Sequence, residues 1–222
     1  MISTALESYQ WVQNRLNKLS TNYGDNIPKY QFVEAFNTAQ LWWLKDMFKL
    51  DDTNILRIDL VQKLLKEVVL TNLALSSDGS YYEVTLPSDY LRYKRSISNS
   101  DCPIYNHLKK EGDINVILMD EFWKPSLEWQ ETICTMVGGK LRIYVDNFTI
   151  SSVNLVYFRN PTDIGLATGF PDINGNPTAD VDPEFSGQAL IDILNLTCKI
   201  LSGDTGDQMN YQIATANQQI HR

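Results

Sequence analysis

The chain has 222 residues, of which 43% are hydrophobic and 11% aromatic, a content that allows a folded core and argues against disorder. Its formal net charge is −8 at pH 7, so it lacks the overall basic character of proteins that grip phosphates. Its overall charge repels DNA, because like charges repel.

The first predicted element is an amphipathic helix. Apolar residues recur every three or four positions from Ile2 to Tyr23, which places them on one helical face. The opposite face carries Gln10, Gln13 and Asn17, which are polar but uncharged. Solvated helices usually carry Lys and Glu on such a face, so we interpret this one as a contact with another chain.

A second helix is predicted after Pro28, a residue that the first turn of a helix tolerates. Phe32, Phe36 and Trp43 lie on one stripe, and further apolar residues widen it, which indicates packing on more than one side. A short helical piece is expected over 60–66.

Beyond this piece the hydrophobic period changes to two, which is typical of strands. A turn is predicted over Ser76–Ser80, followed by a strand in which Tyr82 and Val84 alternate with polar residues until Pro87 ends it. A second β region is predicted over 132–158, with a hairpin at Gly138-Gly139 and a third limb after Asn147. We interpret it as an antiparallel meander.

The residues from Asn160 to Asp182 are rich in Pro, Gly, Asn and Asp and are predicted to form a long functional loop or arm. Oxygen-bearing side chains alternate over Asp172–Asp180, as they do in calcium loops. Because Pro177 and Pro183 occupy the places that require Gly and Glu, a turn-forming loop is the preferred interpretation, and cation binding stays open.

The chain is predicted to end in two helices. The first covers 183–202 and is apolar around most of its circumference, which indicates burial. The second follows Gly206 and carries Met209, Ile213 and Ile220 on one face. Its remaining positions are nearly uncharged, so this helix is also expected to contact another chain.

Together these elements predict an α+β fold, in which N- and C-terminal helices pack around a central antiparallel β region that is a small sandwich or barrel-like. We divide the chain into a helical part (1–66), a β part (67–161), an extended loop (162–182) and the C-terminal helices (183–222). These parts are expected to form one integrated domain.

No catalytic motif accompanies this fold. The two histidines, His107 and His221, are far apart, and no nucleophile elbow, phosphate loop or zinc motif is present. The three cysteines are widely spaced and are interpreted as reduced thiols. We therefore predict no catalytic residue, no cofactor and no metal. A pair of distant carboxylates could still converge in space, which leaves a hydrolase as the alternative.

The aromatic residues are interpreted mainly as core. Trp42, Trp43, Trp123 and Trp129 could each anchor an interface, but burial is the preferred assignment for each of them. The start of the chain has no basic residue or apolar run of the kind found in signal peptides, and no apolar stretch is long enough to span a bilayer. The expected location is therefore the cytoplasm, or a particle assembled there, without a membrane partner.

Four short motifs occur in an order that resembles a known family. They are Leu86–Arg92, Asp120–Ser126, Val156–Pro161 and Pro183–Phe185. Their order and character, over about residues 28–222, resemble the small structural proteins of crAss-like and other short-tailed bacteriophages. That group includes the ring and adaptor proteins that extend the capsid portal.

The resemblance implies a non-enzymatic virion protein that forms a ring of identical subunits between the portal protein and other ring or tail proteins. DNA would pass through the channel without sequence-specific binding. In such a ring each subunit shows two different faces to its neighbours. The residues expected at these contacts are Gln10, Gln13, Asn17, Asp172, Asn174, Asn176, Met209, Ile213 and Ile220. The alternatives are another tail component and a virion-associated hydrolase that acts on cell wall or capsule.

Overall fold

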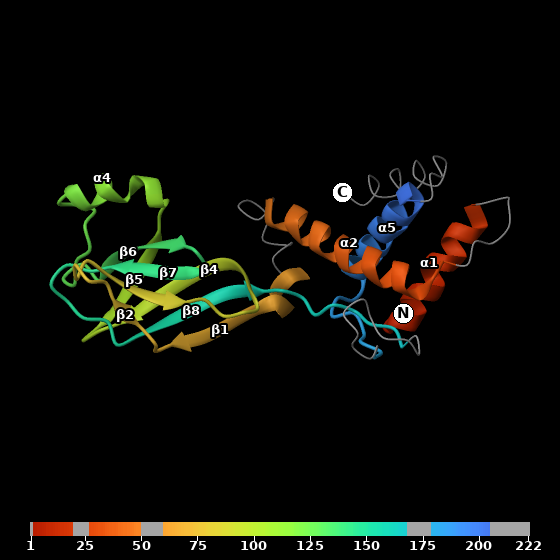
Figure 1. Cartoon of the computed structure of the whole chain (residues 1–222), viewed down its shortest axis with the longest axis horizontal. Coiled ribbons are helices and arrows are strands. Elements are labelled where there is room, and N and C mark those ends of the chain that lie inside the picture. The colour runs from red at the N-terminus through yellow and green to blue at the C-terminus, as the bar shows by residue number, and fades with distance from the viewer. Residues whose placement is uncertain (1, 20–26, 50–59, 168–178, 205–222) are drawn as a thin grey trace. The chain divides into compact units, whose positions relative to one another are not determined.

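The computed structural model describes residues 2–19, 27–49, 60–167 and 179–204. The chain divides into two compact units. The helical unit comprises Met1–Lys63 and Pro161–Arg222, and the β unit comprises Leu64–Asn160. The β unit contains one eight-stranded sheet that curls into a half-barrel (Figure 1). The mixture of helices and a mainly antiparallel sheet confirms the predicted α+β class, whereas a single integrated domain stays a prediction.

The helical unit is built from α1 (Ala5–Leu19), α2 (Lys29–Lys49) and α5 (Gln188–Asp204). The first two confirm the helices predicted at the start of the chain. Tyr9 of α1 meets Phe32 of α2 edge to face, with 5.4 Å between ring centroids. Trp43 of α2 contacts Phe185 in the same way at 5.1 Å. These aromatic contacts join α1 to α2 and α2 to the segment that precedes α5.

Helix α5 begins at Gln188, five residues later than predicted. Gly187 has a φ of +63°, a left-handed conformation that an α-helix cannot contain, so the helix starts only after it. The predicted burial of this helix is confirmed, because Ile193, Leu194 and Cys198 are all buried.

Both ends of the long loop belong to the helical unit. Gly165 and Val181 form an antiparallel β-bridge. The side chain of Asn37 on α2 accepts a hydrogen bond from the amide of Ile164 at 3.0 Å, and Asp182 accepts one from the amide of Ala5 at 2.9 Å. A Cβ atom on Gly165 would clash with a backbone carbonyl oxygen, so glycine is required there. The remainder of the loop, 168–178, lies outside the described residues.

The β unit follows the strand order β1-β8-β4-β5-β6-β7-β3-β2. Neighbouring strands are antiparallel except β5 and β6, which run parallel. The strands are β1 (Leu65–Leu70), β2 (Ala74–Leu75), β3 (Tyr81–Thr85), β4 (Tyr90–Asn99), β5 (Pro103–Leu108), β6 (Glu131–Val137), β7 (Lys140–Tyr144) and β8 (Ser152–Arg159).

Two predicted hairpins are confirmed and the meander is wrong. The turn before Tyr81 joins β2 to β3, and Gly138-Gly139 joins β6 to β7 with φ values of +57° and +76°. However, β8 pairs with β1 and β4 instead of β7. Phe148 and Ile150 in the connecting segment are buried in the main core, so this segment packs across the sheet and carries the chain to distant strands.

Several elements were missed by the sequence reasoning. The helical piece predicted over 60–66 is a helical turn up to Leu64 that leads directly into β1. Strand β4 was not predicted because its register shifts near Tyr90 and again near Tyr93, which breaks the alternation of apolar and polar residues. Strand β5 and the short helix α4 (Ile114–Met119) were also missed.

The sheet carries two separate apolar clusters. The main core lies on one face, which we call the inner face, and includes Ile104, Leu141 and Leu155. A smaller cluster joins Ile114 of α4 to Ile133 and Tyr144, and it defines the outer face. Because β5 and β6 are parallel, their connection must cross over between opposite ends of the strands. This crossover, residues 109–130, contains α4 (Figure 1) and contributes residues to the candidate site.

Candidate functional site

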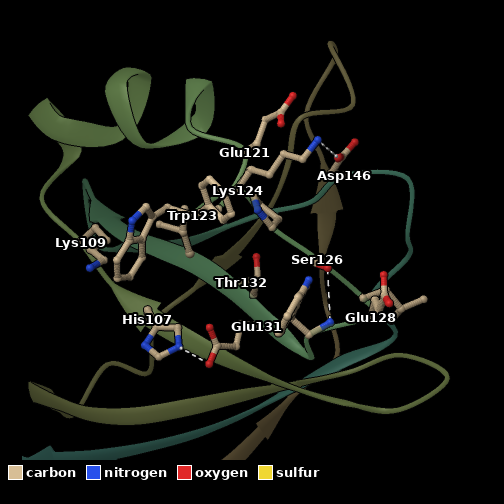
Figure 2. Close-up of a pocket in the computed structure, with 15 residues that line it drawn as sticks. His107, Lys109, Glu121, Trp123, Lys124, Ser126, Glu128, Glu131, Thr132 and Asp146 are labelled. Carbon is tan, nitrogen blue, oxygen red and sulfur yellow. Dashed lines mark hydrogen bonds and ion pairs between the residues drawn. The ribbon is translucent and has the colours of Figure 1, made fainter.

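A cleft of about 590 Å³ lies where the crossover returns to β6. Its walls come from the end of β5, from residues 121–129 of the crossover and from the start of β6, with Asp146 contributing from the segment after β7 (Figure 2). Every lining residue belongs to the β unit. The cleft is therefore formed within one compact body.

One wall of the cleft is a tight turn between Ser126 and Glu131. These two residues form an antiparallel bridge, with N···O distances of 2.9 and 3.2 Å. Gln130 adopts a left-handed φ of +54°, and its carbonyl oxygen accepts a hydrogen bond from the amide of Tyr105 on β5 at 2.8 Å. Leu127 packs against the main core. The turn is thus held at its base, while its tip faces solvent.

Another wall of the cleft is a second turn, which is organised by Asp120. Its carboxylate accepts a hydrogen bond from the amide of Phe122 at 2.9 Å. Its carbonyl oxygen accepts bonds from the amides of Trp123 and Lys124 at 3.2 and 3.0 Å. A short acidic side chain that bonds the backbone two residues ahead is a standard way to fix a turn.

The crossover is tied to the sheet near its beginning. Arg142 on β7 contacts Glu111 at 3.2 Å and Glu83 on β3 at 3.1 Å. Hydrogen bonds from Lys140 and Arg142 hold the pKa of Glu83 below its ordinary value. The guanidinium also lies over the ring of Tyr81, 5.1 Å from its centroid. These contacts and the burial of Ile114 fix the start of the crossover, and the bridge between Ser126 and Glu131 fixes its return to β6.

Three large aromatic side chains of the cleft are exposed. Phe122 is 95% exposed, Trp129 78% and Trp123 61%. The ammonium group of Lys109 lies over the ring of Trp123, 5.3 Å from its centroid. A large apolar group that is fixed in place yet open to water marks a site of interaction.

The predicted burial of the tryptophans is therefore confirmed only for Trp43, which is 3% exposed. It is wrong for Trp123 and Trp129, and also for Trp42, which is 53% exposed on α2. Large aromatic residues are usually buried, and that expectation concealed the site. The available signal was the concentration of aromatic and charged residues over 120–131 without any helical or strand periodicity.

Acidic groups outnumber basic ones around the cleft. The carboxylates are Glu121, Glu128, Glu131 and Asp146, and the ammonium groups are Lys109 and Lys124. Two of the dashed lines in Figure 2 mark contacts between oppositely charged groups. Lys124 lies 3.7 Å from Asp146, and His107 lies 3.6 Å from Glu131, a contact that is an ion pair when the imidazole is protonated. Within the described parts of the chain, Glu121 and Glu128 have no such partner. Negative charge is therefore left over at the cleft.

The carboxylates and thiols near this cleft and in the cores have the following environments. A carboxyl group that acts as a general acid has to be sheltered from water, whereas the side chains of Glu131 and Asp146 are 59% and 42% exposed. Burial raises the pKa of the Cys134 thiol to about 11 and that of Cys198 to about 12, so neither is an activated nucleophile. Among the described residues no group of three His, Cys, Asp or Glu is placed to hold a metal ion.

The contact residues predicted from the sequence are not brought to this cleft. Gln10 is exposed on α1, and the amide of Gln13 donates a hydrogen bond to the hydroxyl of Tyr9 at 2.6 Å. Asn17 lies within α1, but its side chain is outside the described residues. Six further predicted residues also lie outside the described residues: Asp172, Asn174, Asn176, Met209, Ile213 and Ile220. Their roles as contacts stay predictions.

Comparison with protein-family models and with curated proteins gives no match for this chain. No described helix combines the length and the apolar character needed to cross a membrane.

Proposed function

We propose that this chain is a structural protein of a short-tailed bacteriophage particle, which forms a ring between the capsid portal and the tail. The observation that carries the proposal is the set of exposed aromatic side chains, Phe122, Trp123 and Trp129, held on two fixed turns. Such side chains are common anchors of protein–protein contacts, and they are costly to leave exposed in a chain that acts alone.

Assembly into a ring fits this arrangement. Ring contacts are heterologous, so one subunit has to present a receiving surface that differs from the surface it inserts into its neighbour. The cleft supports the receiving role, because it is concave and is built within a single unit. The proposal includes terminal helices that pack around the β region and contact neighbouring subunits, the portal protein and other ring or tail proteins. DNA would pass through the channel without sequence-specific contacts.

The alternative is a virion-associated hydrolase that acts on cell wall or capsule. Its reaction would need two carboxylates that face each other across the scissile bond, with one of them sheltered from water. The ion-paired and exposed carboxylates of the cleft favour binding instead. The Glu131→Gln variant tests this directly, since loss of lytic activity from purified particles would establish the hydrolase.

Quantitative mass spectrometry of purified particles tests the structural role. A constant ratio to the portal protein, near one to one, is the result expected for a ring matched to the portal. Absence of the chain from the particle would overturn the proposal.

A further inference from the structure

The aromatic and acidic residues of the cleft are paired along the sequence. Glu121 precedes Phe122, and Glu128 precedes Trp129. All four line the cleft, and both aromatic side chains are exposed. The cleft therefore combines exposed aromatic rings with carboxylates, and this combination suits a guanidinium group, which can stack on a ring and bond a carboxylate.

A cation already occupies a third ring of the same cleft. The ammonium group of Lys109 lies 5.3 Å from the centroid of Trp123. The ring faces of Phe122 and Trp129 have no comparable cation in the described residues. The cleft thus holds one cation–aromatic contact of its own and has further rings available for cations from another chain.

The balance of charged side chains in the cleft determines the charge of the partner that it can bind. Four carboxylates face two ammonium groups, and one of these, that of Lys124, is engaged by Asp146 at 3.7 Å. The excess negative charge repels nucleic acid and acidic peptides and attracts basic ones. A volume of about 590 Å³ accommodates a few residues of a peptide rather than a folded domain.

We propose that this cleft binds an extended, arginine-bearing segment of a neighbouring protein; the assignment of that protein to the virion rests on the function proposed above. In an extended segment alternate side chains point the same way, about 7 Å apart, so two arginines separated by one residue face the cleft together. Arginine is preferred to lysine, because its planar group stacks on a ring and bonds a carboxylate at the same time.

Calorimetric titration with a short capped peptide that carries arginines at alternate positions tests the inference. The same peptide with citrulline in place of arginine is the matched control, because citrulline keeps the shape and removes the charge. Binding of the arginine peptide, weakened at least about tenfold by citrulline and weakened further by salt, is the expected result. Equal binding of both peptides, or binding of neither, would overturn the proposal.

Substitutions locate the site. Trp129→Ala and the double change Glu121→Gln/Glu128→Gln should each weaken binding about five- to tenfold. The side chains of these residues are exposed, so the fold should persist, and circular dichroism checks this. The matched controls are Trp42→Ala and Glu67→Gln, which are exposed residues that do not line the cleft and should leave binding unchanged. An equal effect of the controls would contradict the assignment.

The remaining outcomes separate the two proposals. If concentration-dependent self-association is abolished by Trp129→Ala and no peptide binds, a second copy occupies the cleft and the arginine-segment proposal fails. If the peptide binds but the chain is absent from particles, the binding proposal stands and the virion function fails. If the chain is present in particles but the peptide does not bind, the virion function stands and the binding proposal fails.

Discussion

Asp89 contacts two strands of the β unit through its side chain. Its carboxylate accepts a hydrogen bond from the hydroxyl of Tyr157 on β8 at 2.6 Å and pairs with Lys66 on β1 at 2.7 Å. Asp89 itself immediately precedes β4. Hydrogen bonds from Lys66 and then from Tyr157 hold the pKa of this carboxyl below its ordinary value. One half-buried carboxylate therefore joins the strands through which the β unit begins and ends.

Replacing Asp89 with asparagine should lower the free energy of unfolding at pH 7 by about 1–2 kcal/mol. Because the folded pKa is lowered, the charge contributes stability above about pH 4, and this contribution is lost as the pH falls through the folded pKa. Urea unfolding at several pH values should therefore show the difference between wild type and variant shrinking in acid. Asp101→Asn, at an exposed turn, is the control and should have little effect.

Two of the three cysteines should be unreactive in the folded protein. Cys134 and Cys198 are buried, and burial raises the pKa of each thiol, to about 11 and about 12. Cys102 is partly exposed. At pH 8 a disulfide reagent should label Cys102 at least about a hundredfold faster than the other two, which should react only after denaturation. Rapid labelling of all three thiols in the native protein would contradict the described core.

At the scale of elements, the periodicity of the sequence predicted individual helices and a hairpin correctly. It did not predict which distant strands pair with each other. Helices α1 and α2 and the β6–β7 hairpin followed from local spacing and from Gly138-Gly139, because those signals lie within one element. The parallel pairing of β5 with β6 and the passage to β8 depend on contacts between residues that are distant in sequence. No local pattern encodes such contacts.

The candidate site depended on the same distant contacts. Its aromatic residues were noticed in the sequence, but Trp123 and Trp129 were assigned to the core. Their exposure follows from the position of the crossover, which is set by Ile114, Leu127 and Arg142. The predicted interface on α1 was drawn from composition alone and stays untested.

The attachment of α4 can be tested with a matched pair on one helix. Ile114 is 4% exposed and packs against Ile133 and Tyr144, whereas Val116 is 73% exposed. Ile114→Ala should lower the free energy of unfolding by about 2–4 kcal/mol, and Val116→Ala should change it by less than about 0.5 kcal/mol. Thermal and urea denaturation measure both. Similar effects of the two substitutions would contradict the outer-face cluster.

At the scale of the whole molecule, the β unit is a continuous segment inserted into the helical unit. It has its own core, and its first and last strands pair with each other, so its ends lie together. A protein restricted to residues 64–160 should therefore fold alone. Well-dispersed amide resonances and a cooperative unfolding transition are the expected results. An unfolded fragment would show that the division into units does not reflect independent stability.

The long loop provides the test of assembly. The amide of Ala167 donates a hydrogen bond to Asp180 at 2.8 Å, so the two arms are close at this point and a short linker can join them. Replacing residues 168–178 with two glycines should leave the Tm nearly unchanged, because Gly165 and its bridge partner Val181 are retained. In the proposed ring the variant should fold but fail to enter particles. Normal particles carrying this variant would remove the loop from the assembly surface.

The pairing of β1 with β8 also determines how the β unit responds to force. Leu65 lies opposite Phe158, so both connections to the remainder of the chain leave from the same end of one antiparallel ladder. Tension applied through these connections would separate β1 from β8 one residue pair at a time, starting at this end. It would not load all the hydrogen bonds of the ladder at once. The Lys66–Asp89 contact lies beside the first pairs to be loaded. The cleft is built on β5 and β6, which come after β8 and β4 in the strand order. It would therefore stay folded while β1 first separates from β8.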